Sequence, residues 1–258
     1  LAGTVCVVPI SLPAAYTEDA ALPNNVLCDA YARQMLPPRS PDSHKGDYGK
    51  VFVLAGSPGL TGAPVLAADA VLKVGAGMVT VGVPASVHGI VAAKLTEAMT
   101  CPLPEMGSAH DMSLSKSAFG VVQEQLAKNN VLLMGCGLGM AESTVDMMHK
   151  LLVDNPLPMV VDADGINALA GNLALLGRRG ADVVLTPHPA EFARMTGMDV
   201  SVVQDNRAEV ARQFAKDFGV SLVLKGSDTV VAHPDGSLYL NTSGNSGMAS
   251  AGSGDVLA

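Results

Sequence analysis

Short runs of β-branched and apolar residues alternate with longer amphipathic segments along most of the chain. The runs VFVLAG (51–56), MVTVGVP (78–84) and VLLMGCGLG (131–139) have the length and composition of buried strands. Helical periodicity follows over residues 64–74 and 142–153. Such alternation usually produces a mostly parallel sheet with helices on both faces, so the pattern predicts an α/β fold.

The second half of the chain continues this rhythm and then changes it. PMVVDADGINALA (158–170) and DVVLTPHPAEFARM (182–195) each read as a buried strand that leads into a helix. Residues 201–219 have the period of one amphipathic helix, with Gly219 as its C-cap. In SLVLKGSDTVVAHPDGSLYLN (221–241) two strands flank a PDG turn, which predicts a small antiparallel addition near the C-terminus.

Composition and charge limit the classes of protein. The 258 residues are 48% apolar, enough for a substantial core, and the net charge of −8 argues against nucleic acid as a partner. The apolar runs are far shorter than the roughly 18 residues of a membrane span, so we expect no membrane partner. Four scattered cysteines without a CxxC pair favour reduced thiols and a cytoplasmic location.

The two ends of the chain suggest its domain organisation. Residues 1–43, rich in Pro, Ala and Asn, read as a lead-in segment, and residues 44–258 as one domain. The chain begins at Leu1 and ends within what reads as the first turn of a helix. We therefore expect a domain that is truncated at its C-terminus.

Small residues crowd the last segment, GNSGMASAGSGDVLA (244–258). Backbone amides at Gly252, Ser253 and Gly254 would point at one anion at the start of a helix, with Asp255 beside it. Phosphate is the natural guest, and a carboxylate there can accept a proton from an attacking hydroxyl. The alternative is a tight glycine-rich turn in which Asp255 only stabilises the helix dipole.

Two further motifs follow predicted strands, where ligands bind in sheets of this kind. In LKGSDT, Lys225 can contact phosphate or be a solvated charge at the rim. In TPHPAEF, His188 can bind a ligand and Glu191 can hold Mg²⁺, or the two only start a helix as N-cap and capping acid. Asp162, at the end of another strand, is a second candidate for Mg²⁺.

Two glycine-rich stretches give weak signals by themselves. GSPGLTGAP (56–64) lacks the Lys-Ser/Thr ending of a P-loop, and GCGLG (135–139) lacks the GxGxxG spacing of a dinucleotide-binding fingerprint. A Rossmann dehydrogenase is therefore disfavoured.

Taken together and in order, five stretches resemble the ADP/ATP-dependent NAD(P)H-hydrate dehydratase family, which has a ribokinase-like fold. The stretches are DSHKGDYGKVFVLAGSPGLTGAPVLAADAVLKVGAGMVTVGVP, VVDADGINALA, LTPHPAEFARM, VLKGSDTVV and NTSGNSGMASAGSGDVLA. The resemblance runs from about Asp42 to the last residue. In addition, VCVVPISLP (5–13) faintly resembles the last strand of an epimerase domain that is fused to some members.

The resemblance implies a repair reaction on hydrated NADH or NADPH. ADP or ATP phosphorylates the C6 hydroxyl of the hydrated nicotinamide ring, phosphate leaves, and the double bond returns. Phosphate is a better leaving group than hydroxide, so a kinase fold can carry out a net dehydration. Mg²⁺ as cofactor and a homo-oligomer, usually a tetramer among the bacterial members, are implied as well.

The resemblance also implies roles for individual residues. Ala63, Gly139, His188 and Asp255 match hydrate-contacting positions, with Asp255 as the catalytic base. The adenine-nucleotide contacts match Lys225, Gly226, Ser227, Asp228, Thr229 and Gly254, within the same glycine loop as Gly252 and Ser253.

Two alternatives stay open from the sequence. The chain can be a kinase of the same fold that acts on a vitamin precursor or a sugar, or a fragment that binds nucleotide without catalysis. The choice between ADP and ATP, and between hydrated NADH and NADPH, also stays open.

Overall fold

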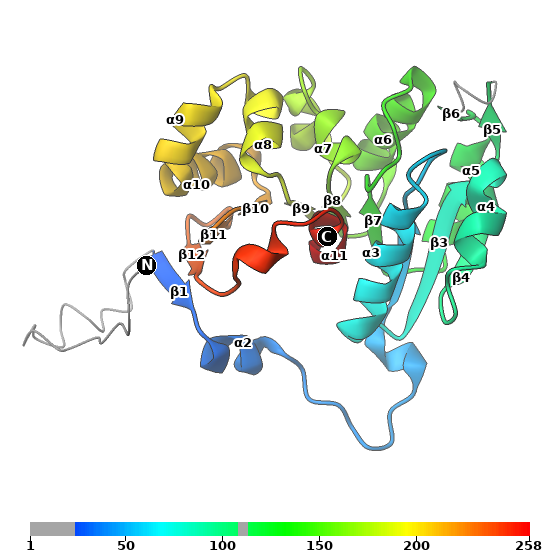
Figure 1. Cartoon of the computed structure of the whole chain (residues 1–258), viewed down its shortest axis with the longest axis horizontal. Coiled ribbons are helices and arrows are strands. Elements are labelled where there is room, and N and C mark those ends of the chain that lie inside the picture. Colours follow the sequence, from blue (N-terminus) through cyan, green and yellow to red (C-terminus); the bar gives the residue numbers. More distant parts are fainter. Residues whose placement is uncertain (1–23, 108–112) are drawn as a thin grey trace, which may run out of the picture.

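Ten strands form one twisted sheet through the whole molecule (Figure 1). The computed structural model describes residues 24–107 and 113–258. The strand order is β1-β12-β11-β10-β9-β8-β7-β2-β3-β4. The strands are β1 (Asn24–Leu27), β2 (Lys50–Leu54), β3 (Met78–Pro84), β4 (Met99–Leu103), β7 (Val131–Met134), β8 (Met159–Val161), β9 (Val183–Leu185), β10 (Ser221–Leu224), β11 (Thr229–Ala232) and β12 (Leu238–Asn241).

The pairings from β4 through β10 are all parallel. This confirms the α/β class with a mostly parallel sheet that the sequence predicts. The predicted addition near the C-terminus is also present, because β11 pairs antiparallel with both β10 and β12. A separate two-stranded sheet joins β5 (Glu105–Met106) to β6 (Ser113–Leu114).

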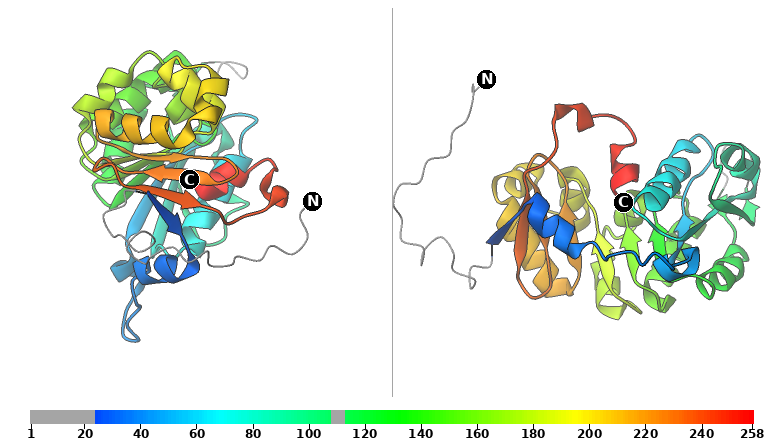
Figure 2. Two further views of the ribbon diagram at one scale, coloured as in Figure 1. Left: turned by 90° about the vertical axis from the view of Figure 1, so that its left-hand side faces the viewer. Right: turned by 90° about the horizontal axis from the view of Figure 1, so that it is seen from below.

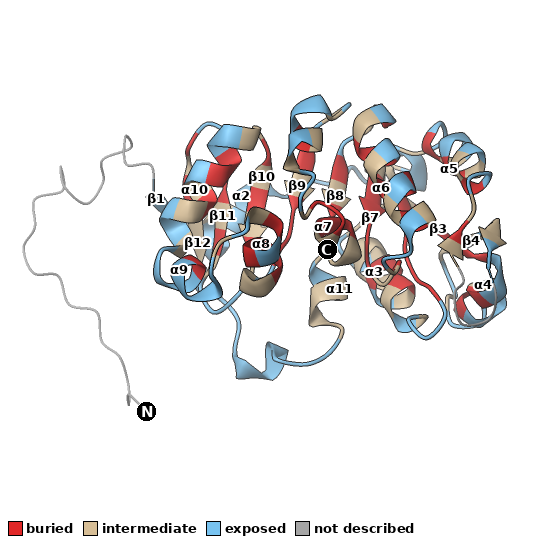
Figure 3. Cartoon of the chain, turned by 90° about the horizontal axis from the view of Figure 1, so that it is seen from above, coloured by how far each residue is buried: buried red, intermediate tan, exposed pale blue. Residues whose placement is uncertain are grey.

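Helices cover both faces of the sheet, and side chains alternate between the two. On β2, Phe52 and Leu54 belong to the larger apolar core, whereas Val53, and Ala55 directly after the strand, belong to the smaller one. The larger core includes side chains of α5 (Ala118–Leu126), α6 (Glu142–Asp154), α8 (Pro189–Thr196) and α10 (Arg207–Phe218). The smaller core includes side chains of α3 (Gly62–Lys73) and α4 (Ala85–Ala92), and Figure 3 shows the buried stripes of both sets.

The segment before residue 44 adds to the sheet and then crosses below it. Strand β1 pairs in parallel with β12, and Tyr31 on α2 (Asp29–Met35) donates a hydrogen bond to Tyr239. The chain then passes beneath the molecule to the short 3₁₀ helix Lys45–Tyr48, which leads into β2 (Figure 2). The stretch at 5–13 that resembles an epimerase strand lies outside the described residues.

The helix predicted over 201–219 is wrong as one element. Two helices occupy this segment, α9 (Val200–Asp205) and α10. They are separated by Asn206, whose backbone is not helical, with φ −129° and ψ 30°. Gly219 ends α10 in the left-handed conformation, as predicted. The remaining helical segments are α7 (Asp164–Asn167), α11 (Ser253–Leu257) and the 3₁₀ turns Leu173–Arg178 and Ser246–Met248.

Within residues 24–107 and 113–258, no helix combines the length and the apolar character that crossing a membrane requires.

Candidate active site

Three polar side chains follow three neighbouring parallel strands at the point where each strand ends. Asp162 comes directly after β8, Thr186 after β9 and Lys225 after β10. The carboxyl ends of parallel strands share one edge of the sheet, and ligands bind at that edge in folds of this type.

These three side chains form one buried polar group. Lys225 Nζ lies 2.8 Å from Asp162 Oδ1, and Thr186 Oγ1 donates to the same oxygen at 2.7 Å. The Asp162 side chain is 2% exposed and that of Lys225 is 16% exposed. A buried charge is costly without a partner of opposite charge, and Lys225 and Asp162 are such partners for each other. Lys225 is therefore not a solvated charge at the rim.

Helix α11 brings Asp255 to this group. Gly252, in the left-handed conformation, is the N-cap of this five-residue helix, and Asp255 lies in its first turn. A Cβ atom added to Gly254 would lie 3.6 Å from Lys225 Nζ, so the start of α11 borders the ammonium group. The amide of Ser253 donates to Ser250 O at 3.4 Å, whereas those of Gly254 and Asp255 belong to the first turn, where a helix has no acceptors of its own.

The environment of Asp255 changes its acidity. Burial raises the pKa of the Asp255 carboxyl, and the negative charge of Asp162 raises it further, while Cys136 and Lys225 oppose the shift. A carboxylate with a raised pKa is a stronger base than an exposed one. The group is therefore suited to accept a proton from a substrate.

Cys136, in the loop after β7, is a site residue that sequence reasoning missed. Its side chain is fully buried, and Sγ lies 3.9 Å from Asp162 Oδ2. Burial raises the pKa of the Cys136 thiol, as do the charges of Asp162 and Asp255. The group is thus a neutral thiol, able to donate weakly to carboxylates.

The loop after β2 and the start of α3, which carries Ala63, contact the loop after β7, which contains Gly139. Ser57 Oγ donates to Gly137 O at 2.8 Å, and a Cβ atom on Gly137 would lie 3.2 Å from Ala63 Cβ. The Gly139 amide donates to Asp164 Oδ2 at 2.8 Å. Helix α3, which carries Ala63, also packs against α11, the helix that contains Asp255.

His188 and Glu191 take the capping roles that were the alternative to ligand binding. His188 Nδ1 accepts from the amides of Ala190 and Glu191, and Glu191 Oε2 accepts from the His188 amide at 2.8 Å. The His188 side chain is still 49% exposed and lies beside the site, because the Lys225 amide donates to Pro187 O at 2.9 Å.

The carboxylates of Asp162 and Glu191 are engaged by protein groups in this arrangement. Asp162 Oδ1 faces Lys225 and Thr186, and Glu191 Oε2 is used by the helix cap and lies 3.9 Å from Lys225 Nζ. Across residues 24–107 and 113–258, no three His, Cys, Asp or Glu side chains are grouped as metal ligands. Their assignment to Mg²⁺ stays a prediction, and no chemical step below depends on it.

The loop between β10 and β11 carries the positions expected to contact adenine nucleotide. Thr229 Oγ1 donates to Gly226 O at 2.9 Å, and Asp228 adopts a positive φ of 54°. The same loop begins with Lys225, so it borders the buried polar group. The carbonyl of Ser227 accepts from Arg207.

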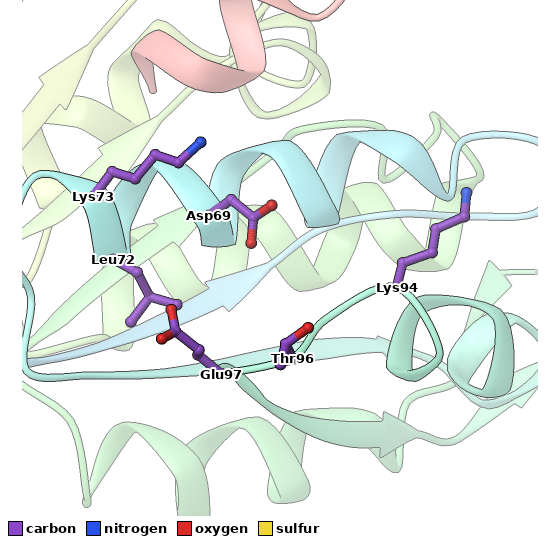
Figure 4. Close-up of a pocket in the computed structure, with 6 residues that line it drawn as sticks. All are labelled: Asp69, Leu72, Lys73, Lys94, Thr96 and Glu97. Carbon is purple, nitrogen blue, oxygen red and sulfur yellow. The ribbon is translucent and has the colours of Figure 1, made fainter.

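Two hollows lie away from Asp255. One, of about 450 Å³, is lined by Asp69, Leu72, Lys73, Lys94, Thr96 and Glu97 on the outer side of α3, and Figure 4 shows charges of both signs around it. The other, of about 1020 Å³, lies between residues 36–48 and Val74–Ala76. Neither contains a residue of the candidate active site, which is defined by its polar groups.

Of the three residues that sequence reasoning missed, Thr186 and Cys136 had a recognisable signal and Arg207 had none. Thr186 directly follows a predicted buried strand, as Asp162 and Lys225 do, and Cys136 lies in the glycine-rich stretch GCGLG at the end of another. Arg207 had no such signal, because it lay within a segment predicted as one continuous helix.

Comparison with known proteins agrees with the resemblance. The family model described as NAD(P)H-hydrate dehydratase matches residues 51–258. An ADP-dependent (S)-NAD(P)H-hydrate dehydratase of Neisseria meningitidis is 39% identical over 225 residues, which are 85% of this chain and 70% of that protein. A bifunctional NAD(P)H-hydrate repair enzyme of Moorella thermoacetica is 45% identical over all of this chain and 48% of its own length.

Solved structures agree as well. The ADP/ATP-dependent NAD(P)H-hydrate dehydratase of Bacillus subtilis, co-crystallized with ATP and Mg²⁺, has a TM-score of 0.73 at 32% identity, covering 90% of this chain and 78% of that one. A ribokinase-like superfamily protein of Enterococcus faecalis has a TM-score of 0.75 at 25% identity, covering 91% and 77%. The chain spans about half the length of the bifunctional relatives that it matches. By the match over residues 51–258 and by these relatives, the chain belongs to the NAD(P)H-hydrate dehydratase family.

Proposed function

We propose that this protein dehydrates hydrated NADH or NADPH at the expense of ADP or ATP. The observation that carries the proposal is the convergence of Asp255, Lys225 and the first turn of α11 at the carboxyl edge of the sheet. A base, a cation and free backbone donors at one place are what phosphoryl transfer to a hydroxyl requires. The membership of the family supports this reaction over that of a vitamin or sugar kinase.

Asp255 begins the reaction as a general base. The C6 hydroxyl oxygen attacks the terminal phosphorus of the nucleotide, Asp255 accepts the hydroxyl proton, and the bond to the bridging oxygen breaks. When ADP is the donor, the product nucleotide is AMP; when ATP is the donor, it is ADP. Lys225 and the first-turn amides of α11 stabilise the charge on the transferred group.

The second step restores the reduced cofactor. The C6–O bond breaks and phosphate leaves with the electron pair, while loss of a proton from C5 forms the C5=C6 double bond. The proton from C5 and the proton held by Asp255 pass to the released phosphate and to water, so the sum is hydrate plus ADP giving NAD(P)H, AMP, hydrogen phosphate and one proton.

Mg²⁺ accompanies the nucleotide in this proposal. The Bacillus subtilis relative was crystallised with ATP and Mg²⁺, and the ion is commonly held by substrate phosphates together with few protein ligands. This fits a site whose buried carboxylates are engaged by Lys225 and the α8 cap. Bound in this way, the ion would neutralise charge on the phosphates.

The replacement Asp255→Asn tests the proposal. We expect it to lower turnover by about 100-fold or more, because it removes the proton acceptor, while ADP still binds. Recovery of the absorbance of reduced nicotinamide from the hydrate, with Mg-ADP present, measures turnover. Asp146→Asn, at an exposed position on α6, is the matched control.

Two results would contradict the proposal. One is a wild-type protein that gives no reduced nicotinamide from either hydrate with ADP or ATP. The other is full turnover by Asp255→Asn, which would remove Asp255 from the role of base.

We also propose that the protein forms a homo-oligomer in the cytoplasm. The support is the family resemblance, since tetramers are usual among the bacterial members. Light scattering of the purified protein measures the number of subunits, and a monomer at micromolar concentration would contradict the proposal.

A further inference from the structure

Arg207 lies behind the loop that joins β10 to β11 and binds it at three points. Its Nη1 donates to Ser227 O at 2.6 Å, and its Nη2 donates to Leu224 O at 2.9 Å and to Lys225 O at 3.1 Å. All three acceptors are backbone carbonyls of one short segment. A guanidinium group is planar and presents its donors in a fixed fork, so these bonds set the shape of the segment.

The loop and the guanidinium group fit each other closely. Gly226 has a φ of +148°, and a Cβ atom there would lie 2.8 Å from both Nη1 and Nη2 of Arg207. Asp228, two residues later, has a φ of 54°, which residues other than glycine seldom adopt. Arg207 binds the carbonyl of Ser227, the residue directly before Asp228, and so borders this turn.

The guanidinium group of Arg207 loses part of its contact with water in this position. Nε is buried without a hydrogen-bond partner in the described part of the chain. Burial lowers the pKa of Arg207, while the charge of Asp228 opposes this shift. A cation that gives up solvent to bind three carbonyls of one loop serves that loop and not the core, which is apolar around α10.

We infer that Arg207 is a positioning residue for adenine-nucleotide binding: it holds Lys225–Thr229 in the receptive shape before the nucleotide arrives. The inference rests on the proposed function. Arg207 fixes the backbone of Lys225, whose ammonium group lies at the start of α11, and the loop that follows it. A loop that is ordered in advance loses less conformational freedom on binding, so it binds more tightly.

The test compares Arg207→Lys and Arg207→Ala with Arg212→Lys. Arg212 lies on the same helix and also donates to a loop carbonyl, that of Gly236, away from the nucleotide loop. Calorimetry with ADP measures Kd, and steady-state kinetics measure kcat and both KM values. We expect the Kd and KM for ADP to rise roughly tenfold in both Arg207 variants, with the KM for the hydrate little changed. The Arg212→Lys variant should match the wild type.

A second measurement separates positioning from general stability. Hydrogen exchange of Arg207→Lys should be faster at the amides of residues 226–229 and unchanged through α6 and α8. Wild-type ADP affinity in Arg207→Lys, or faster exchange spread over the whole molecule, would overturn the inference. If the wild type neither binds ADP nor consumes the hydrate, the proposed function fails; if it does both and the Arg207 variants bind ADP as it does, only the inference fails.

Discussion

Asp255 is the residue on which the proposed chemistry depends most. Its carboxyl group is partly buried near Asp162, and these two causes, burial first, raise its pKa. Lys225 lies close enough to oppose the shift but is already paired with Asp162. The base is therefore kept in an environment that disfavours its charge, and both activity and stability depend on pH as a result.

The activity should depend on pH through Asp255. The base works only when it is deprotonated, so we expect kcat to fall as the pH drops through its raised pKa. The fall should begin at a higher pH than an exposed aspartate would give. A profile of kcat against pH measures this, and a profile that stays flat down to the ordinary aspartate range would contradict it.

The stability should depend on pH in the opposite sense. Between the unfolded and the raised folded pKa of Asp255, the unfolded chain binds fewer protons, so the free energy of unfolding falls as pH rises. Asp255→Asn removes this penalty. We expect the variant to melt at a higher temperature than the wild type at neutral pH, with no gain at a pH below the ordinary aspartate range. Calorimetry at the two pH values measures the difference.

Cysteine reactivity should follow burial. Cys28 is exposed, Cys101 is partly buried and Cys136 is buried, and burial raises the pKa of the last two thiols. Since the thiolate is the reactive form, we expect iodoacetamide to modify Cys28 first and Cys136 only in denaturant. Peptide mass spectrometry measures each site, and native modification of Cys136 as fast as that of Cys28 would argue against its buried position.

The sequence indicated individual residues better than their partners. Asp162 and Lys225 could be predicted as site residues because each ends a strand. Their ion pair could not, because 63 residues separate them and the strand order β8-β9-β10 decides who meets whom. The capping box of His188 and Glu191 was visible in the sequence but could not be told apart from a ligand site.

At the scale of elements, the period of apolar residues predicted the positions of those strands and helices that local sequence determines. The strands and helices around β2, α3, β7 and α6 lie where the apolar pattern placed them. The break between α9 and α10 was missed, because Asn206 interrupts the helical conformation while the period of apolar residues continues past it. It is this break that makes Arg207 the first residue of α10, where its side chain reaches the loop between β10 and β11.

The end of α10 gives a test of its geometry. Gly219 has a φ of +64°, and a Cβ atom there would lie 3.0 Å from Arg179 Nη2, so Gly219→Ala should destabilise the protein by about 1 kcal/mol. Gly89, inside α4, has no atom within 4 Å of an added Cβ. As the matched control, Gly89→Ala should stabilise the protein by roughly 0.5 kcal/mol. Urea unfolding measures both, and equal effects would contradict the assigned conformations.

At the scale of the whole molecule, the sheet separates two apolar cores and supports the site at its carboxyl edge. Neighbouring residues of β7 divide between the cores, since Leu132 belongs to the larger and Leu133 to the smaller. The class of fold could be predicted because this burial on both faces leaves nearly continuous apolar runs. The pairing of β1 with β12 could not, since it joins segments over 200 residues apart that carry no matching pattern.

Loss of packing in the larger core should weaken the whole fold. Leu132 is fully buried and stands opposite Phe52 in the β2–β7 register. We expect Leu132→Ala to lower the free energy of unfolding by about 3 kcal/mol. Val74→Ala, at an 83% exposed position, should change it by less than about 0.5 kcal/mol. Urea titrations measure both, and similar losses would contradict the placement of Leu132.

Strand β1 also affects how molecules of this protein meet one another. Without β1, the sheet would end at β12, and the unpaired backbone N–H and C=O groups of β12 could pair with a strand of another molecule. With it, the outermost strand is only four residues long and begins with two exposed asparagines, Asn24 and Asn25. Short polar edges are poor templates for intermolecular pairing. The first described residues of the chain thus protect the protein against aggregation through its sheet.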